Sequence, residues 1–507
     1  MKPVFTYFGP PGTGKTTTLL NRVEELLDEG VSPKKIGYFA FTRKAAYEAR
    51  DRASQKFSRS SDDFPFFQTL HSLAFRCLGL SGSDVIKESD LREFAKKEPI
   101  GDLNFMERTQ DENFTMLRCN EPVMRCIDLA RSSLEGPEKA YNNPNIRLNI
   151  RLYHFLHIYS EYEKFKRLHG LLDFTDMIIN LVKEPSLIPS FHTTFIDEAQ
   201  DLTPLQHELL TRISESSDQC FAAGDDDQGI YQWAGASISR FLGLKGGSQV
   251  LDQSYRIPRA VHDIADRVAR RIRRRHPKDW KPRSENGSIT HVSTPDSLDF
   301  NNGEDWLCLS QARFMMDPLA DFLKKSGHYF TRGGNPSLEK KVLGAIKSWA
   351  HLNKGEGLSH KDALQLYDHI GVGPNLQRGF KSQLKAADES DIFTLDILRQ
   401  DFGLTGEGDW QTVLDRIKDE PRTYATALQK RGVNIFEEPK IKISTIHGAK
   451  GGEAQNVLLD LSLTGNALAT FQGDPDSGNR LLYVGITRAK QNLYLQHPEN
   501  RQRGWII

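Results

Sequence analysis

Short apolar runs alternate with helical patterns over the first 80 residues of the chain. Residues 4–8 are apolar, aromatic or β-branched and end at a glycine-proline cluster, as a buried strand does. Leucine and valine then recur at helical spacing over 16–29, which predicts a helix that ends at Gly30. A second strand is expected at 36–41 and an alanine-rich helix at 45–53. This alternation predicts a parallel sheet covered by helices on both faces.

The pattern changes twice further along the chain. Residues 81–174 are polar with helical stretches, and 346–435 form a second polar, mainly helical block. Around these blocks, short apolar segments typical of sheet strands return at 195–196, 220–223, 306–309, 441–445, 457–461 and 493–495. We therefore predict an α/β protein with two sheet domains, each interrupted by a helical insertion.

Composition restricts the class of protein. A chain of 507 residues corresponds to about three or four domains. Lys+Arg and Asp+Glu both number 67, which argues against a wholly basic surface but not against a local basic groove. The five cysteines form no Cys-x-x-Cys pair and are expected to be reduced thiols. With no apolar run of about 18 residues and no signal peptide, we expect a cytoplasmic protein without a membrane span.

The chemistry of the chain begins with a glycine-rich loop between the first strand and the first helix. Residues 9–16 fit G-x-x-x-x-G-K-[ST], whose backbone N–H groups cradle phosphate oxygens at a helix N-terminus. Lys15 can reach the β- and γ-phosphates of ATP, and the Thr16 hydroxyl can ligate Mg²⁺. The predicted nucleotide-binding residues here are Gly9, Pro10, Pro11, Gly12, Thr13, Gly14, Lys15, Thr16 and Thr17. A glycine-rich connection without chemical meaning is the alternative.

A pair of acids follows the apolar residues Phe195-Ile196. Asp197 is predicted to hold Mg²⁺, and Glu198 to polarise the attacking water. A solvated acidic turn is the alternative, because Asp201 follows closely.

An ordered series of motifs over nearly the whole chain resembles superfamily 1 helicases of the UvrD/Rep/PcrA type. Beyond the phosphate loop and the Asp197-Glu198-Ala199-Gln200-Asp201 motif, the series comprises residues 41–46, 69–73 (T-x-H-S), 173–176 (D-F-x-D), 224–236 (G-D-x-x-Q-x-I-Y-x-W), 253–256, 444–453 (T-x-H-x-x-K-G-x-E) and 483–489. The family usually has Asn in place of Arg43. The resemblance implies two RecA-like motor domains: 1–80 with 175–246, and 247–345 with 436–507. It also implies helical insertions at 81–174 and 346–435.

Roles at the nucleotide follow from the resemblance. Arg256 and Arg488 should face the γ-phosphate from the second motor domain, as arginine fingers supplied within the chain. Gln228 should sense the γ-phosphate and link it to the nucleic acid. Tyr255 resembles the aromatic that stacks on the nucleotide base, and Glu453 the carboxylate that accepts from the ribose hydroxyl.

The resemblance also implies a track for single-stranded nucleic acid, in which bases stack on aromatic rings in any sequence. The expected contacts are Phe41, Thr42, His71, Tyr231, Trp233, Arg332, Thr445 and His447. Core packing is the alternative for Phe41, which ends a strand. The run of arginines from 270 to 275 has two open interpretations, a nucleic-acid contact or a solvated helix face.

By resemblance the chain is expected to be a monomeric, ATP- and Mg²⁺-dependent DNA helicase that moves 3′ to 5′ on single-stranded and tailed duplex DNA. The alternatives are a translocase that strips proteins with little unwinding, a non-motor NTPase switch, and an RNA motor. Three departures from the family pattern bear on this expectation. First, the start of the chain leaves no room for an adenine-reading glutamine motif, so looser NTP selection is expected. Second, Ala234 replaces an arginine of the family motif. Third, His497 takes the place of an aromatic strand-separation pin.

Overall fold

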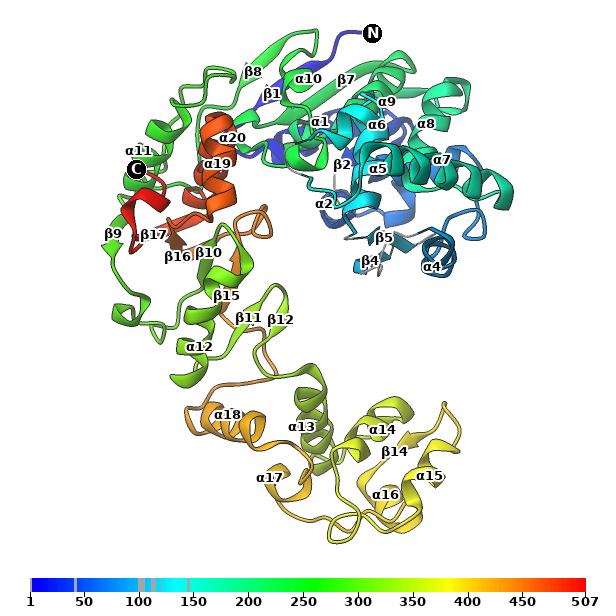
Figure 1. Cartoon of the computed structure of the whole chain (residues 1–507), viewed down its shortest axis with the longest axis vertical. Helices are drawn as coiled ribbons and strands as arrows, with labels where there is room; N and C mark the ends of the chain where they lie inside the picture. The colour runs from blue at the N-terminus through cyan, green and yellow to red at the C-terminus, as the bar shows by residue number, and fades with distance from the viewer. Residues whose placement is uncertain (1, 41–42, 99–104, 111–114, 120, 144–145) are drawn as a thin grey trace. The chain divides into compact units, whose positions relative to one another are not determined.

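The chain divides into two compact units, which are described separately (Figure 1). One unit comprises residues 1–287 with 466–487 and 507, and the other comprises 288–465 with 488–506. The computed structural model describes all residues except 1, 41–42, 99–104, 111–114, 120 and 144–145.

A six-stranded sheet forms the centre of the first unit, and every neighbouring pair of its strands is parallel. In sheet order the strands are β3 (Phe67–Thr69), β2 (Ile36–Ala40), β6 (Phe191–Ile196), β7 (Ser217–Gly224), β1 (Phe5–Phe8) and β8 (Ser248–Val250). The carboxyl ends of parallel strands share one edge, where open α/β sheets bind their ligands. The loops after β1, β6 and β7 therefore come together there.

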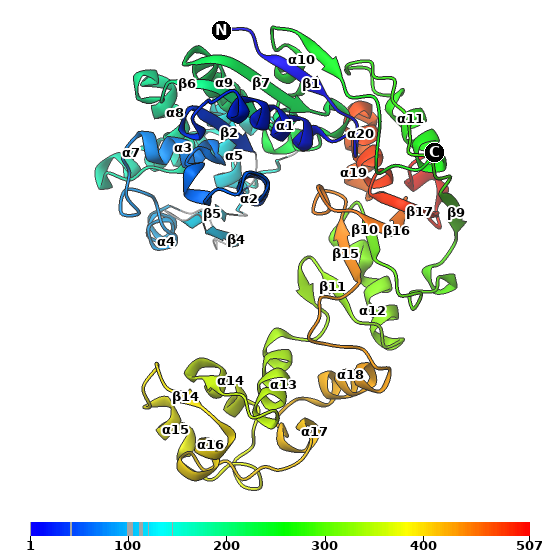
Figure 2. The ribbon, with the colours of Figure 1, turned by 180° about the vertical axis from the view of Figure 1, so that it is seen from behind.

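Helices cover both faces of this sheet because its strands are apolar on both sides. Successive residues point to opposite faces, so Tyr38 and Phe195 belong to one apolar core and Phe39 and Ile196 to the other. The first core is closed by α1 (Lys15–Asp28) and α2 (Arg43–Phe57), and the second by α3 (Leu70–Cys77), α8 (Phe174–Lys183) and α9 (Pro204–Glu215) (Figure 2). The first unit also contains α10 (Ile238–Leu242), α11 (Arg259–Ala269) and α20 (Pro475–Ile486), and α20 packs against α11.

The insertion predicted at 81–174 has an apolar core of its own, built by α4 (Glu88–Lys97), α5 (Pro122–Ser132), α6 (Pro137–Tyr141) and α7 (Leu152–His169). It also contains an antiparallel pair, β4 (Phe105–Gln110) and β5 (Thr115–Cys119), which the helical pattern did not predict. A buried ion cluster ties α5 and α7 to the start of α8. In it, Lys166 Nζ lies 2.8 Å from Asp173 and 2.7 Å from Asp176, and Arg131 pairs with both carboxylates.

The second unit is built on a seven-stranded sheet in which only the β11–β12 pair is antiparallel. In sheet order the strands are β12 (Asn335–Pro336), β11 (Phe330–Arg332), β15 (Ile441–Thr445), β10 (Trp306–Ser310), β16 (Ala454–Asp460), β17 (Ala489–Gln496) and β9 (Ser288–Val292). Helix α12 (Asp317–Lys325) packs its leucines into the core of this sheet. Helix α19 (Gly465–Gly473) begins at the last residue of this segment of the second unit, and its other residues belong to the first unit.

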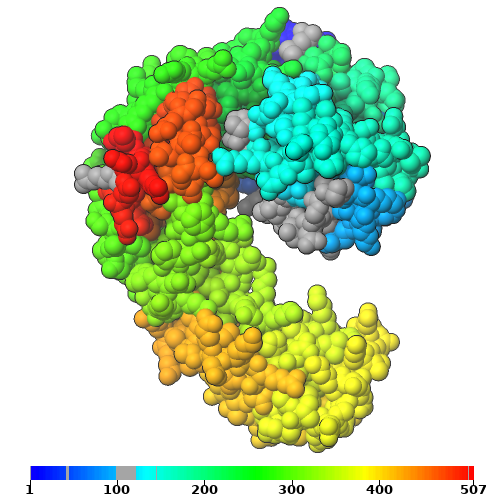
Figure 3. Space-filling view, viewed as in Figure 1, coloured from blue at the N-terminus to red at the C-terminus, as the bar shows by residue number. Residues whose placement is uncertain are grey.

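A second helical body follows β12 and has a separate core, centred on Trp349, Tyr367 and Leu398. It comprises α13 (Lys340–Asn353), α14 (His360–Asp368), α15 (Phe380–Lys385), α16 (Leu395–Asp401), α17 (Trp410–Val413), α18 (Asp419–Lys430) and the short pair β13 (Leu358–Ser359) and β14 (Ile392–Phe393). Figure 3 shows this segment, coloured yellow to orange, as a rounded body. In the part of the chain that the structure describes, every helix is too short or too polar to cross a membrane.

The predicted fold class is confirmed: the protein is an α/β protein with two parallel-stranded sheets, each accompanied by a mainly helical insertion. The exact domain limits stay predictions. Strand β8 follows the limit predicted at residue 246 and pairs with β1 in the first sheet. The 253–256 segment, predicted in the second motor domain, lies in the first unit.

Candidate nucleotide site and strand-binding surface

The glycine-rich loop joins the carboxyl end of β1 to the first turn of α1. Gly12 and Gly14 have φ values of 73° and 80°, in the left-handed region that glycine adopts without strain. Lys15 Nζ donates a hydrogen bond of 2.8 Å to the Gly9 carbonyl, and Thr13 Oγ1 donates one of 2.8 Å to the Pro10 carbonyl. The loop thus folds around its lysine at the N-terminus of α1, the geometry of a phosphate cradle.

Asp197 follows β6 and meets the end of the loop. Thr16 Oγ1 donates a hydrogen bond of 2.7 Å to Asp197 Oδ2, and the Tyr38 hydroxyl donates one of 2.9 Å to the same oxygen. Burial raises the pKa of Asp197, and the neighbouring Glu198 carboxylate raises it further. A hydroxyl and a buried carboxylate held together are oxygen ligands of the kind that Mg²⁺ prefers, so this pair fits the metal that a nucleoside triphosphate carries.

Glu198 has a φ of 54°, one of three non-glycine residues among those described with a left-handed backbone. Its carboxylate accepts a hydrogen bond from the Gln200 amide, and the Gln200 carbonyl accepts one of 3.0 Å from the backbone N–H of Asp225. Gln200 is fully buried. It therefore connects the acid predicted to polarise water with the segment that follows β7.

The 253–256 segment packs directly on the phosphate loop. Ser254 Oγ donates a hydrogen bond of 2.7 Å to the Pro11 carbonyl, and the Tyr255 N–H donates one of 2.9 Å to the Gly12 carbonyl. A Cβ on Gly12 would lie 2.3 Å from Arg256 Cβ, so only glycine fits there. The Tyr255 side chain is 74% exposed beside the loop, as a ring that receives a nucleotide base must be.

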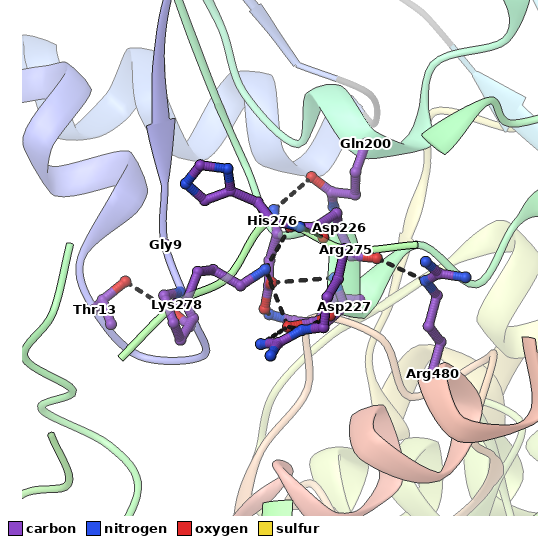
Figure 4. A network of polar contacts seen from close by, with 12 residues as sticks. Gly9, Thr13, Gln200, Asp226, Asp227, Arg275, His276, Lys278 and Arg480 are labelled. Carbon is purple, nitrogen blue, oxygen red and sulfur yellow. Dashed lines mark hydrogen bonds and ion pairs between the residues drawn. The ribbon is translucent and has the colours of Figure 1, made fainter. Parts of the chain in front are cut away.

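Three consecutive aspartates after β7 form a buried cluster with basic residues (Figure 4). Lys278 Nζ lies 2.9 Å from Asp225 and 3.0 Å from Asp227, and it also pairs with Asp226. Arg275 binds Asp227 through Nε at 2.9 Å and a terminal nitrogen at 2.7 Å. Burial alone would lower the pKa of Lys278, but the three carboxylates outweigh it and raise the pKa.

The same cluster fixes neighbouring parts of the site. Asp225 Oδ2 accepts a hydrogen bond of 2.8 Å from the Gln228 amide, so the predicted γ-phosphate sensor is held by the clustered acid. The His276 ring stacks on Phe8, the last residue of β1, at 3.9 Å between ring centroids. Arg480 on α20 donates a hydrogen bond of 2.9 Å to the Asp226 carbonyl. Strand β1, the motif after β7 and α20 are thus joined around one buried charge cluster.

The predicted aromatic platform lies five residues beyond Gln228. The Tyr231 and Trp233 rings meet edge to face, with centroids 6.4 Å apart. The Trp233 side chain is 37% exposed, and Tyr231 is half-buried. The His71 ring lies against Phe174, with centroids 5.8 Å apart. Phe41 and Thr42 lie outside the described residues.

The remaining predicted residues belong to the second unit. Thr445 ends β15 and accepts a hydrogen bond of 3.1 Å from the Gly448 N–H, and His447 follows it. Glu453 directly precedes β16 and lies 3.3 Å from Lys490; Arg488 directly precedes β17. The Arg488 guanidinium is buried and donates to the Gly452 carbonyl at 3.2 Å. Arg332 Nη2 donates to the Arg313 carbonyl at 3.0 Å and pairs with Asp317.

Four residues of the site were not predicted from the sequence. Tyr38 and Gln200 contact the predicted acids Asp197 and Glu198. Lys278 and Arg480 contact aspartates of the 224–236 motif, to which no role was assigned. The signal for Lys278 was the acidic run at 225–227, which needs a buried counter-charge. Of the arginine run, Arg275 supplies part of that charge, and Arg270 pairs with Asp266 on α11 at 2.6 Å.

A strand, a glycine-rich loop and a helix, with a hydroxyl that meets a buried carboxylate from a nearby parallel strand, define a P-loop nucleoside triphosphatase. The model of the UvrD/REP helicase N-terminal domain matches residues 5–247, and that of the UvrD-like helicase C-terminal domain matches 423–500. The two models match in order and together cover more than half of the chain. The chain therefore belongs to the UvrD/REP helicase family, as the motif series predicted.

Relatives along nearly the whole chain agree with this assignment. The ATP-dependent DNA helicase PcrA of Staphylococcus aureus is 24% identical over 596 residues, which cover 97% of this chain and 80% of that protein. The ATP-dependent DNA helicase PcrA of Bacillus subtilis is 22% identical, also over 97% of this chain and 80% of that protein. The probable DNA helicase II homolog of Mycoplasma genitalium is 24% identical, over 97% of this chain and 82% of that protein.

A solved complex of the arterivirus nonstructural protein 10 helicase with DNA superposes with a TM-score of 0.35 at 12% identity. It covers 98% of this chain, which spans 62% of the length of that one.

Proposed function

We propose that this chain is an ATP-dependent DNA helicase that moves 3′ to 5′ along single-stranded DNA and separates the strands of a duplex. One observation carries the proposal. A single short segment, Asp225–Trp233, begins at the nucleotide edge of the first sheet and ends at a partly exposed pair of aromatic rings. A conformational change at the nucleotide can therefore be transmitted through only a few residues to a surface suited to bases.

The nucleotide half of the proposal rests on the side chains around the loop. Mg²⁺, when bound, neutralises phosphate charge, and Thr16 with Asp197 would hold it. Lys15 binds the β- and γ-phosphates once it leaves the Gly9 carbonyl. Glu198 orients the attacking water and accepts its proton, in a position fixed by Gln200. Arg256, packed on Gly12, and Arg488 stabilise the charge that develops on the γ-phosphate.

The strand half rests on the aromatic rings. Base–aromatic stacking contributes roughly 1–3 kcal/mol per base and does not depend on sequence, which suits a motor that passes over any sequence. We assign this stacking to Tyr231 and Trp233, whose rings meet edge to face, and phosphate contacts to His71, Thr445 and His447. Gln228 couples the two halves because the Asp225 carboxylate holds its amide.

The test is ATP turnover with and without single-stranded DNA, combined with unwinding of duplexes that carry a 3′ or a 5′ tail. The wild-type protein should show DNA-stimulated turnover and should unwind only the 3′-tailed duplex. Lys15→Ala should abolish turnover while DNA binding stays measurable. Lys35→Ala is the matched control, because Lys35 is exposed and, among the described residues, its ammonium donates only to the Ser190 carbonyl.

Each result decides between functions. Turnover that single-stranded DNA leaves unchanged would contradict a motor and favour an NTPase switch. Stimulated turnover that displaces streptavidin from a biotinylated strand, without unwinding either duplex, would identify a protein-stripping translocase. Unwinding of the 5′-tailed duplex alone would reverse the proposed polarity.

A further inference from the structure

Helix α5 of the first insertion packs against the turn that carries Trp233. Gly235 in this turn has a φ of 95°, and a Cβ on it would lie 3.2 Å from Leu129 Cδ1 and 3.3 Å from Ser132 Oγ. Residues 125, 129 and 132 are spaced by four and three positions, so they lie on one face of the helix. The face that closes on the turn therefore carries Arg125 one helical turn further back.

The Arg125 guanidinium lies over the Trp233 ring, with 5.5 Å between Cζ and the ring centroid. This is the geometry of a cation–π contact, in which arginine and tryptophan are the favoured partners. Ala234, beside the tryptophan, carries no charge. The cation at this ring therefore comes from the insertion and not from the turn itself.

Among the described residues, no carboxylate forms an ion pair with the Arg125 guanidinium. The nearest acid toward the helix start, Glu121, caps α5 by accepting hydrogen bonds of 2.6 Å from Val123 N and 3.1 Å from Met124 N. Within the described part of the chain no Asp or Glu forms an ion pair with Arg125. A guanidinium has five N–H donors in one plane, and a ring contact uses only its face.

We propose that Arg125 is a nucleic-acid-binding residue that braces the Trp233 ring and binds a phosphate of the strand whose base stacks on that ring. The proposal rests on the proposed function, because it requires a strand at Trp233. Stacking places the base against the ring and leaves its phosphate beside it, where an in-plane N–H of the guanidinium can donate. The helical insertion then supplies part of the strand grip that starts from the motor sheet.

The experiment is fluorescence anisotropy of the full chain with a labelled oligothymidylate about 16 nucleotides long, over a series of KCl concentrations. Arg125→Ala should raise Kd roughly tenfold and reduce the slope of log K against log salt by about 0.7, the value for one phosphate on a single strand. Arg125→Lys should keep the wild-type slope because it keeps the charge. The double variant Arg125→Ala with Ala234→Arg should recover part of the affinity.

Arg92→Ala is the matched control, since it removes the same charge from the same insertion. Arg92 is exposed on α4 and bound to Glu88 at 2.7 Å, so its loss should change neither Kd nor slope. Circular dichroism and thermal melting of each variant show whether it is folded. If Arg125→Ala is not, Arg125→Gln removes the charge while keeping most of the side chain, and it should reduce the slope by the same amount.

The outcomes separate this proposal from the one it rests on. If the wild-type protein does not bind the oligomer, or if Trp233→Ala binds as well as wild type, the proposed strand site fails. If Trp233→Ala weakens binding but Arg125→Ala leaves both Kd and slope unchanged, the role of Arg125 is overturned. A weaker Kd with an unchanged slope would reduce Arg125 to a brace for the ring and overturn the phosphate contact.

Discussion

Lys278 and Asp225 form a fully buried ion pair, with 2.9 Å between Nζ and Oδ1. Asp225 uses its other oxygen to hold the Gln228 amide, so a lysine 53 residues along the chain fixes the predicted sensor through one carboxylate. The same ammonium also pairs with Asp226 and Asp227. Together with Arg275, which binds Asp227, Lys278 thus makes a run of three buried acids compatible with folding.

Replacing this lysine should be costly. Lys278→Met leaves buried carboxylates without their counter-charge, and breaking a buried pair from one side typically costs about 3–5 kcal/mol. We expect a large drop in the denaturant midpoint of the first unit, measured by urea titration. Lys281→Met is the control, because Lys281 is mostly exposed, 3.4 Å from Asp252, and should change stability by less than about 1 kcal/mol. Similar midpoints for the two variants would contradict the role of the cluster.

A methyl group on the phosphate loop should disturb the nucleotide site. In Gly12→Ala the new Cβ would meet Arg256 Cβ at 2.3 Å, at a φ of 73° that alanine resists. We expect ATP turnover to fall by more than about tenfold, since a displacement of roughly 1 Å can cost about a hundredfold. Gly30→Ala has a similar φ of 87° but open space around its Cβ, so it separates backbone strain from the clash. Equal turnover in the two variants would count against the packing of Arg256 on the loop.

The exposed ring of Tyr255 should bind the nucleotide base. Its side chain is 74% exposed, and its N–H is anchored to the Gly12 carbonyl at 2.9 Å. Removing a stacking ring costs roughly 1–3 kcal/mol, so Tyr255→Ala should weaken binding of a fluorescent ATP analogue by about five- to a hundredfold. Tyr153→Ala, at a 63% exposed tyrosine on α7, should leave the affinity unchanged. If Tyr255→Ala binds the ATP analogue as tightly as wild type does, a residue other than Tyr255 binds the base.

Apolar runs predicted most of the strands in the middle of both sheets, because burial on both faces selects such residues at every position. Strand β15 occupies 441–445 as predicted, and β2 occupies 36–40 of the predicted 36–41. Strands β3, β8, β9, β11 and β12 were not predicted. Four of them have only two or three residues, and β9 is mostly exposed, so pairing with a neighbouring strand makes them strands rather than a pattern of their own.

Motif spacing predicted the local chemistry of the site but not its long-range contacts. The loop and the acid after β6 meet as predicted, since Thr16 lies 2.7 Å from Asp197. The placement of Arg256 against Gly12, in the same unit as the loop, and the pairing of Arg275 with Asp227 depend on how separate elements pack. A single sequence holds no signal for such pairs beyond the need of a buried charge for a partner.

His207 should make stability depend on pH. It lies on α9 inside the apolar core, and neither ring nitrogen has a hydrogen-bond partner among the described residues. Burial lowers its pKa to about 4. Because the folded pKa lies below the unfolded value near 6.5, the unfolded state takes up a proton first as pH falls. The contribution of His207 to the free energy of unfolding is complete above about pH 6.5, and it is lost as the pH falls to about 4.

Between about pH 7 and pH 5 the free energy of unfolding of the wild-type protein should therefore fall by roughly 2 kcal/mol more than that of His207→Leu. The measurement is the free energy of unfolding by urea at both pH values, taken as the difference between wild type and variant. If wild type and variant lose the same free energy of unfolding between the two pH values, the imidazole has a hydrogen-bond partner or contacts water in the folded protein. His154→Leu is the control, because His154 is exposed and stacks on Tyr153 at 5.1 Å. A divergence from wild type as large as that of His207→Leu would contradict the role of burial. Only a histidine withheld from water in the folded state can produce the expected divergence, because the unfolded chain exposes both residues equally.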